Sequence, residues 1–420
     1  MVRLLIVATL VLVPPAALLA AEPSRYSIDL GADLSYVDAS GYPSWAEGSA
    51  GKLRYDSDSD GFVLSRAYAD YKLRVADTLD AHVVAELYTD GIGSTIDFTE
   101  AYFEWRPLTV TANRYRVKVG AFYPHVSLEN TGLAWTSPYT ISASAINSWI
   151  GEEFRNFGVE FSVSRRPQFL GGSHVFSLQA SVFQNNDPAG TYLSWKGWSV
   201  HDRQTRFGDE LPLPPVPQIQ PGMTFSLQDP YLDPFREIDN RVGYYVSGDW
   251  KIGNRFLLRL MHYDNRADPE AYEDGQFGWT TDFNHVGVQA TLPGDTGLIA
   301  QWMNGSTVWG RFFNGVRAVD ADFYSYFLLL TKALDRHRFT VRYDVFDVSE
   351  NDDFPLDENS EYGNAWTLAY QYEASKYATL ALEWLQIETY REAFEYFGFP
   401  DDVTERQVQL AVRLRFGSGS

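Results

Sequence analysis

Apolar and polar residues alternate with a period of two along most of this chain. Residues 26–36 are the first example, with apolar or aromatic side chains at even positions and small or acidic ones at odd positions. A strand with one face in an apolar medium and the other in a polar one shows this pattern. Similar stretches lie at 63–75, 79–87, 99–106, 114–121 and 156–163, with further candidates near 173–183, 241–252, 255–264, 281–292, 297–304, 322–333, 336–347, 364–373, 377–387 and 406–416. The sequence therefore predicts an all-β chain of about 16 strands.

The connections between the predicted strands alternate in length. The short ones lie at 76–78, 253–254, 293–295, 334–335 and 375–376. The long ones lie at 38–60, 123–154, 184–240, 265–279, 305–321, 348–363 and 388–405, and 89–94 is a tight exception among them. Short turns at one rim and long loops at the other are typical of a transmembrane antiparallel β-barrel with both termini on the periplasmic side. A soluble β-sandwich would not need this bias.

Two of the long connections have distinctive compositions. The first, 123–154, is rich in Gly, Pro, Ser, Thr and aromatic residues and contains no Lys or Arg. Compact domains rarely keep a long internal loop without a role, so we predict that it folds into the lumen and narrows it. The second, 184–240, contains LPLPPVPQIQPG and is predicted to be an extended, Pro-stiffened extracellular loop.

Charged residues opposite the apolar faces are expected to line the lumen, because an Arg or Lys at the lipid midplane costs about 2–4 kcal/mol. Two interpretations stay open: a basic wall that attracts anions, or salt bridges that stiffen the wall. The aromatic residues of 123–154 either stack against sugar rings or pack the loop against the wall. The predicted pore-lining and constriction residues are Arg66, Lys72, Arg74, Glu100, Glu104, Arg106, Arg114, Arg116, Lys118, Glu129, Trp135, Tyr139, Trp149, Glu152, Glu153, Arg259 and Arg342. Other acids on the same faces include Asp70, Glu86, Glu160, Asp249, Asp344 and Glu383.

Charge and composition exclude several classes of protein. The formal net charge of -21 argues against a nucleic-acid partner, since such domains are usually basic. The chain has no Cys, so it has no disulfides or thiolate metal sites. It also lacks G-x-S-x-G, HExxH, P-loop and dinucleotide motifs, and we expect no enzyme, cofactor or metal centre. The acidic stretch 349–362 predicts a solvated extracellular face, or alternatively a site where divalent cations bridge to lipopolysaccharide.

The two ends of the chain carry signals of export and barrel assembly. Arg3, the apolar run 4–13 and the small residues of 16–21 predict a secretory signal peptide over 1–21, too short to span a bilayer. The mature chain, 22–420, is then a single barrel. Its last predicted strand ends in the aromatic Phe416, followed by the tail 417–420. These features predict a protein of the bacterial outer membrane.

Three segments resemble the outer-membrane porins related to the phosphate-selective O/P family: EAYFEWRP at 100–107, RVKVGAFYPHVSLEN at 116–130 and EEFRNFGVEFS at 152–162. The resemblance implies a 16-stranded, water-filled pore that is constricted by the loop after the fifth strand and assembles as a homotrimer. A loop that strips water from an oxyanion needs cations or other donors. Since 123–154 has no Lys or Arg, the sequence does not predict the family's basic phosphate clamp.

These observations favour an outer-membrane porin for passive diffusion of small hydrophilic solutes or ions, with lipid and lipopolysaccharide around it. The alternative is a barrel with a plugged lumen that acts as a receptor, adhesin or lipid enzyme. A secreted, soluble carbohydrate-binding protein is a third interpretation. The sequence alone names no solute.

Overall fold

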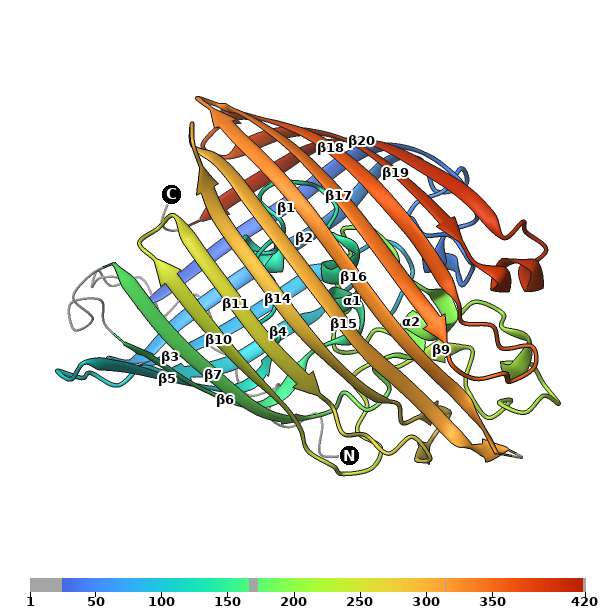
Figure 1. The fold of residues 1–420 in the computed structure, drawn as a ribbon. Helices are drawn as coiled ribbons and strands as arrows, with labels where there is room; N and C mark the ends of the chain where they lie inside the picture. Colours follow the sequence, from blue (N-terminus) through green and yellow to red (C-terminus); the bar gives the residue numbers. More distant parts are fainter. Residues whose placement is uncertain (1–24, 166–172, 314, 418–420) are drawn as a thin grey trace.

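The computed structural model describes residues 25–165, 173–313 and 315–417. Sixteen strands form one closed barrel in which neighbours pair antiparallel (Figure 1). The predicted all-β barrel of about 16 strands is therefore confirmed. The predicted signal peptide, 1–21, lies outside the described residues. The strands are β1 (Tyr26–Ser40), β2 (Gly61–Ala76), β3 (Leu79–Leu87), β4 (Ile96–Trp105), β5 (Asn113–Phe122), β6 (Asn156–Arg165), β7 (His174–Gln184), β10 (Gly243–Ile252), β11 (Phe256–Asp264), β14 (Thr280–Leu292), β15 (Thr296–Phe313), β16 (Val316–Leu334), β17 (His337–Glu350), β18 (Glu361–Ser375), β19 (Ala378–Tyr390) and β20 (Asp402–Gly417).

The first and last barrel strands close the ring. In β1 and β20, Leu30 lies opposite Phe416 on the outer face, and Asp33 lies opposite Arg413 on the inner face. Within the described ranges, each barrel strand therefore has a partner on both sides, and its backbone hydrogen bonds are made within the sheet. The aromatic end of the final strand is thus part of the seam.

The period-two pattern sorts side chains between the two faces of the wall. Within β1, Leu34 is 48% exposed on the outside, whereas its neighbour Ser35 is 3% exposed on the inside. Outward-facing leucines and the exposed rings of Trp105, Trp302 and Trp366 form an apolar and aromatic belt of the kind that contacts lipid. Among the described residues, no helix is long and apolar enough to cross a membrane.

One predicted loop is a strand pair instead. The sequence predicts a long connection at 305–321, but β15 and β16 continue through it almost to their turn. Thr307 and Trp309 remain buried on the inner face, and a register shift follows Trp309 beside Gly310, whose φ is 84°. Small and polar residues interrupt the apolar pattern there, yet the strands still pair because the backbone supplies the hydrogen bonds.

Two long connections fold into the barrel. We call 123–155 the constriction loop and 185–242 the second loop. The constriction loop contains α1 (Ala145–Glu153) and the 3₁₀ turn η3 (Leu133–Trp135). The second loop contains α2 (Thr191–Lys196), the short pair β8 (Leu211–Pro212) and β9 (Tyr231–Leu232), and η5 (Pro217–Ile219) (Figure 1). The remaining short elements are η2 (Trp45–Glu47), β12 (Tyr272–Glu273), β13 (Gln276–Phe277) and η6 (Glu392–Phe397).

The second loop differs from the extended extracellular loop that the sequence predicts at 184–240. Its first part, 186–206, is buried throughout and packs against inward-facing wall residues. Trp198 lies 6.2 Å from Phe323 and 6.5 Å from Phe346, measured between ring centroids. The Pro-rich part, which includes η5, lies further along the loop. Burial of the aromatic half outweighs the extended preference of the Pro-rich half.

Candidate pore constriction

The constriction loop is fastened where it leaves and rejoins the wall. Tyr123, just after β5, stacks on Trp135 with ring centroids 4.1 Å apart. The guanidinium of Arg155, just before β6, lies 3.3 Å from the centroid of the Tyr123 ring. Arg155 also donates to the carbonyl oxygens of Thr99 and Thr205 at 3.0 and 2.9 Å. A planar guanidinium suits such combined stacking and hydrogen bonding, so the two ends of the loop are held together.

The loop then crosses the bore and reaches the opposite wall. The backbone N–H of Leu128 donates to Gln301 Oε1 on β15 at 2.8 Å. The N–H groups of Ile141 and Ser142 donate to Glu383 on β19 at 2.6 and 3.0 Å. The loop therefore spans the lumen from one side of the sheet to the other.

Arg342 on β17 joins the constriction loop to the wall through several contacts. Its Nη1 lies 2.7 Å from Glu129 Oε1 of the loop, and its Nε lies 2.8 Å from Asp344 Oδ2 of the same strand. Arg342 also donates to the carbonyl oxygens of Ser142 and Ala143, both at 2.9 Å. The Arg342 and Glu129 side chains are fully buried. A buried charge is tolerated only when it is paired and hydrogen-bonded, and here the loop supplies most of the acceptors.

The two carboxylates at the end of α1 bind the second loop. Glu152 accepts from Lys196, from His201 Nε2 at 2.7 Å and from Ser199 Oγ at 3.1 Å. Lys196 and His201 lower the pKa of Glu152 to about 2, against the opposing effect of burial. The charged Glu152 therefore joins the two in-folded loops.

Glu153 holds the start of α2. It accepts from the backbone N–H groups of Gly190, Tyr192 and Leu193 at 3.1, 3.0 and 3.3 Å. Burial raises its pKa to about 7, although these donors favour the charged form. Glu152 and Glu153 are buried and bind the second loop to the constriction loop. Their positions in the sequence alone do not reveal this role.

Of the aromatic residues predicted in the constriction loop, Trp149 is buried, whereas Trp135 and Tyr139 are half-buried. Trp149 is 2% exposed, and its ring centroid lies 5.5 Å from that of Trp198 and 4.9 Å from that of Phe323. Trp135 stacks on Tyr123, and the Tyr139 ring lies 5.5 Å from the guanidinium carbon of Arg338. Trp149 therefore belongs to an apolar core inside the barrel, formed by both in-folded loops and inward-facing wall residues.

Most predicted wall charges are brought next to an opposite charge or another polar partner. Arg66 pairs with Asp33, Arg259 with Asp249, Lys72 with Asp70 and Arg74 with Asp80. Glu104 pairs with Arg106 and Arg116, and Arg116 also pairs with Glu160. Glu100 accepts a hydrogen bond from the backbone N–H of Tyr123. The ammonium group of Lys118 lies over the Tyr102 ring. Arg114 forms no ion pair with any residue of the described ranges. The sequence analysis did not single out Lys196 and His201, because their partner lies on another loop.

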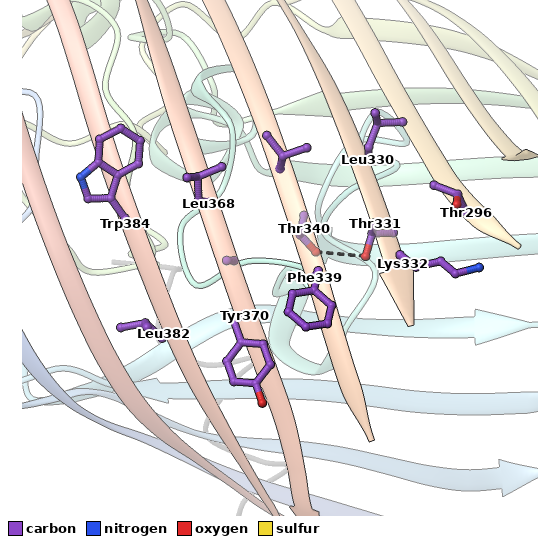
Figure 2. Close-up of a pocket in the computed structure, with 12 residues that line it drawn as sticks. Thr296, Leu330, Thr331, Lys332, Phe339, Thr340, Leu368, Tyr370, Leu382 and Trp384 are labelled. Atoms are coloured by element: carbon purple, nitrogen blue, oxygen red, sulfur yellow. Dashed lines mark hydrogen bonds between the residues drawn. The ribbon is translucent and has the colours of Figure 1, made fainter. Parts of the chain in front are cut away.

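Cavities lie on both faces of the wall. On the inside, Arg114, Arg116 and Lys251 line a cavity of about 730 Å³. A smaller one, of about 160 Å³, is lined by several arginines including Arg338 and Arg413. On the outside, Figure 2 shows an apolar groove of about 530 Å³ with Phe339, Leu368, Tyr370, Leu382 and Trp384. The groove lies in the apolar outer belt, on the face of the wall opposite the lumen.

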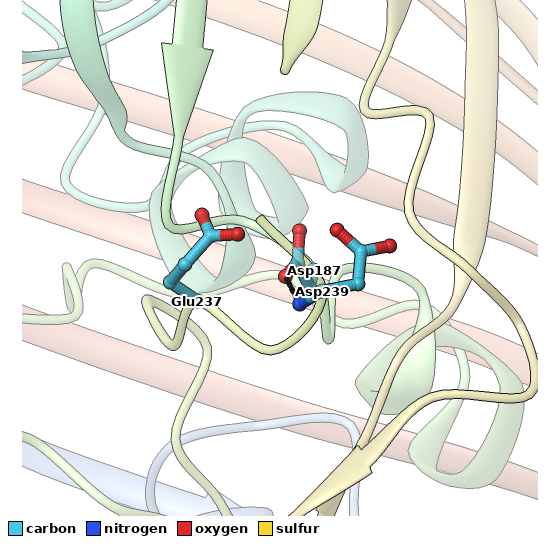
Figure 3. A group of neighbouring side chains, drawn as sticks. All are labelled: Asp187, Glu237 and Asp239. Carbon is cyan, nitrogen blue, oxygen red and sulfur yellow. Dashed lines mark hydrogen bonds between the residues drawn. The ribbon is translucent and has the colours of Figure 1, made fainter. Parts of the chain in front are cut away.

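Asp187, Glu237 and Asp239 form a cluster of carboxylates in the second loop (Figure 3), with ligand atoms within 4.8 Å of one another. Backbone N–H groups occupy these oxygens. Ile238 N donates to Asp187 at 2.5 Å, and Asn185 N donates to Glu237 at 2.9 Å. The cluster is therefore explained by loop folding. Burial, with Glu237 and Asp239 nearby, raises the pKa of Asp187 to about 7.

This raised pKa predicts that the second loop becomes less stable as pH rises. The folded loop holds the Asp187 proton more tightly than the unfolded chain, so stability falls between about pH 4 and pH 7. Asp187→Asn keeps an acceptor for Ile238 N and removes the titration. We expect hydrogen exchange at 236–241, corrected for intrinsic rates, to be slower in the variant at pH 8 and nearly equal at pH 4. Equal protection at both pH values would contradict this assignment.

A closed 16-stranded antiparallel barrel with a loop folded into its lumen is a porin-type fold. No protein-family model matches the chain, and no curated protein matches its sequence. The structure is similar to the outer membrane channel DcaP of Acinetobacter baumannii, with a TM-score of 0.53 and 11% identity over 93% of this chain and 96% of that one. It is also similar to a loop L8 deletion mutant of OmpT, an outer membrane protein of Vibrio cholerae, with a TM-score of 0.52 and 11% identity over 93% and 98% of the two chains. These likenesses establish the fold, and the resemblance to phosphate-selective porins is not confirmed.

Proposed function

We propose that this chain is a bacterial outer-membrane porin through which small hydrophilic solutes or ions diffuse, and that its two in-folded loops keep it narrow. The observation that carries the proposal is a charged inner wall combined with a loop that crosses the bore inside an apolar outer belt. Such a wall provides a polar path where lipid provides none. The lumen-lining roles of the residues named above and assembly as a homotrimer are part of this proposal.

The apolar core between the in-folded loops and the inner wall favours one second candidate, a plugged barrel that acts as a receptor or adhesin. Trp149, Trp198 and Phe323 fill space that a wide pore would leave to water. The two candidates differ in conduction. A porin with a narrow constriction passes a small ionic current, whereas a plugged receptor passes none until a partner displaces its loops.

Planar-bilayer recording of the purified, folded protein tests the proposal. We expect small, stepwise and ohmic currents, and in a salt gradient a reversal potential that indicates anion preference, because Arg114 and Lys251 are unpaired within the described ranges and face the same cavity. Absence of current from the natural protein, together with current through a variant with a released constriction loop, would support the plugged receptor.

A further inference from the structure

The larger inner cavity is built on four neighbouring strands, β5, β6, β7 and β10. Two rows of directly paired residues cross its wall. In one row, Arg114 lies opposite Ser164, Ser164 opposite Ser177, and Ser177 opposite Asp249. In the other, Arg116, Ser162, Gln179 and Ser247 follow in the same order. Each row therefore begins with an arginine and continues through hydroxyl or amide groups, and the first row ends at the carboxylate of Asp249.

The cavity carries surplus positive charge. Arg114 and Lys251 line it, and neither forms an ion pair within the part of the chain that the structure describes. The acids nearby are already engaged: Asp249 binds Arg259 at 2.8 Å and His125 at 3.2 Å, and Glu160 binds Arg116 at 3.1 Å. Burial and Arg259 lower the pKa of His125 to about 4, so it adds no charge at neutral pH. An anion in the cavity would meet two uncompensated cations.

The same wall offers buried hydrogen-bonding groups without partners. Gln179, which lines the cavity, is 4% exposed and its Oε1 has no hydrogen-bond partner. The hydroxyl of Ser247, opposite it in the register, is likewise unpartnered in a side chain that is 1% exposed. Buried polar groups are rarely left unsatisfied. An acceptor such as Gln179 Oε1 calls for a donor from outside the chain, and a ligand hydroxyl provides one.

We propose that this wall binds small hydroxylated carboxylates, the class to which sugar acids belong. The carboxylate lies near Arg114 or Lys251, and the ligand hydroxyls exchange hydrogen bonds with Gln179 and the serines. The cavity, at about 730 Å³, falls within the usual range for small-ligand sites. This inference names a substrate class and rests on the proposed porin function for its biological meaning, but binding itself does not require conduction.

Calorimetric titration of the full-length protein in detergent tests the site, with glucuronate, acetate and glucose as probes. We expect saturable binding of glucuronate at low salt, weaker binding of acetate and the weakest binding of glucose. The variant with Arg114→Gln and Lys251→Gln is expected to lose roughly tenfold or more in glucuronate affinity, since charge-assisted hydrogen bonds are the strong ones. Lys376→Gln, in an exposed turn, is the matched control and should bind like the natural protein.

A second variant separates charge from hydroxyl recognition. Ser164→Ala with Ser177→Ala should weaken glucuronate binding and leave acetate binding unchanged, while circular dichroism confirms that the barrel is folded. Glucuronate binding that is no tighter than acetate binding, or that survives the loss of both cations, would overturn the proposal. Glucuronate binding without conductance would reject the porin function and support the binding site. Conductance without glucuronate binding would support the porin function and reject the binding site.

Discussion

Replacing Arg342 with methionine is expected to release the constriction loop and raise single-channel conductance several-fold. The substitution leaves Glu129 buried without its cation and removes the donors to Ser142 and Ala143. Breaking a buried ion pair by removing one partner costs about 3–5 kcal/mol. The loop can avoid this cost by moving so that Glu129 reaches water, and that movement widens the bore.

The control for this experiment is Lys376→Met, which removes an exposed cation from the turn between β18 and β19. It should conduct like the natural protein. A triple variant, Arg342→Met with Glu129→Gln and Asp344→Asn, removes the charges together and should recover much of the low conductance, because no uncompensated charge remains buried. Unchanged conductance in Arg342→Met would show that packing alone holds the loop.

The barrel could be predicted because each wall strand has two different environments. An exposed apolar face outside and polar contacts inside impose a period of two, and Leu34 and Ser35 show that contrast at adjacent positions. The alternation of inward- and outward-facing positions along each strand also predicted that the side chains of Arg342, Asp344 and Glu383 point inward. Their partners could not be predicted, because Glu129 lies far from Arg342 in the sequence and only the path of the loop brings them together.

The lack of Lys and Arg between residues 123 and 154 of the constriction loop has a structural explanation. The loop contributes acceptors, namely Glu129 and the carbonyl groups of Ser142 and Ala143, and the wall contributes the cation Arg342. A basic loop would meet a wall that is itself rich in arginine. The composition therefore indicated a steric and aromatic constriction. The alternation of inward- and outward-facing positions in the strands could not show that a wall arginine holds the loop in place.

The inward fold of the second loop was missed because its Pro-rich half dominated the interpretation. A signal was present in 188–200, where tryptophans and small residues surround the single charge of Lys196. An exposed loop rarely concentrates apolar side chains in this way. The partner that makes burial of Lys196 tolerable is Glu152 on α1, and no local pattern identifies it.

Glu152→Gln is expected to separate the second loop from the constriction loop. It leaves the buried Lys196 without a carboxylate, and loss of one partner of a buried pair costs about 3–5 kcal/mol. We expect faster hydrogen exchange across 187–206, with the barrel strands unaffected. Glu210→Gln, at an exposed position of the same loop, is the matched control and should leave exchange unchanged.

The acid dependence of this contact has a definite sign. The folded-state pKa of Glu152, about 2, lies below its ordinary value. Its contribution to the stability of the folded loops is therefore present above about pH 4.5 and is lost as pH falls towards 2. The double variant Glu152→Gln with Lys196→Met removes both charges and should exchange more slowly than Glu152→Gln alone. If the two substitutions were additive, direct coupling between the residues would be rejected. Non-additivity would identify their ion pair as the contact that holds the two loops together in the lumen.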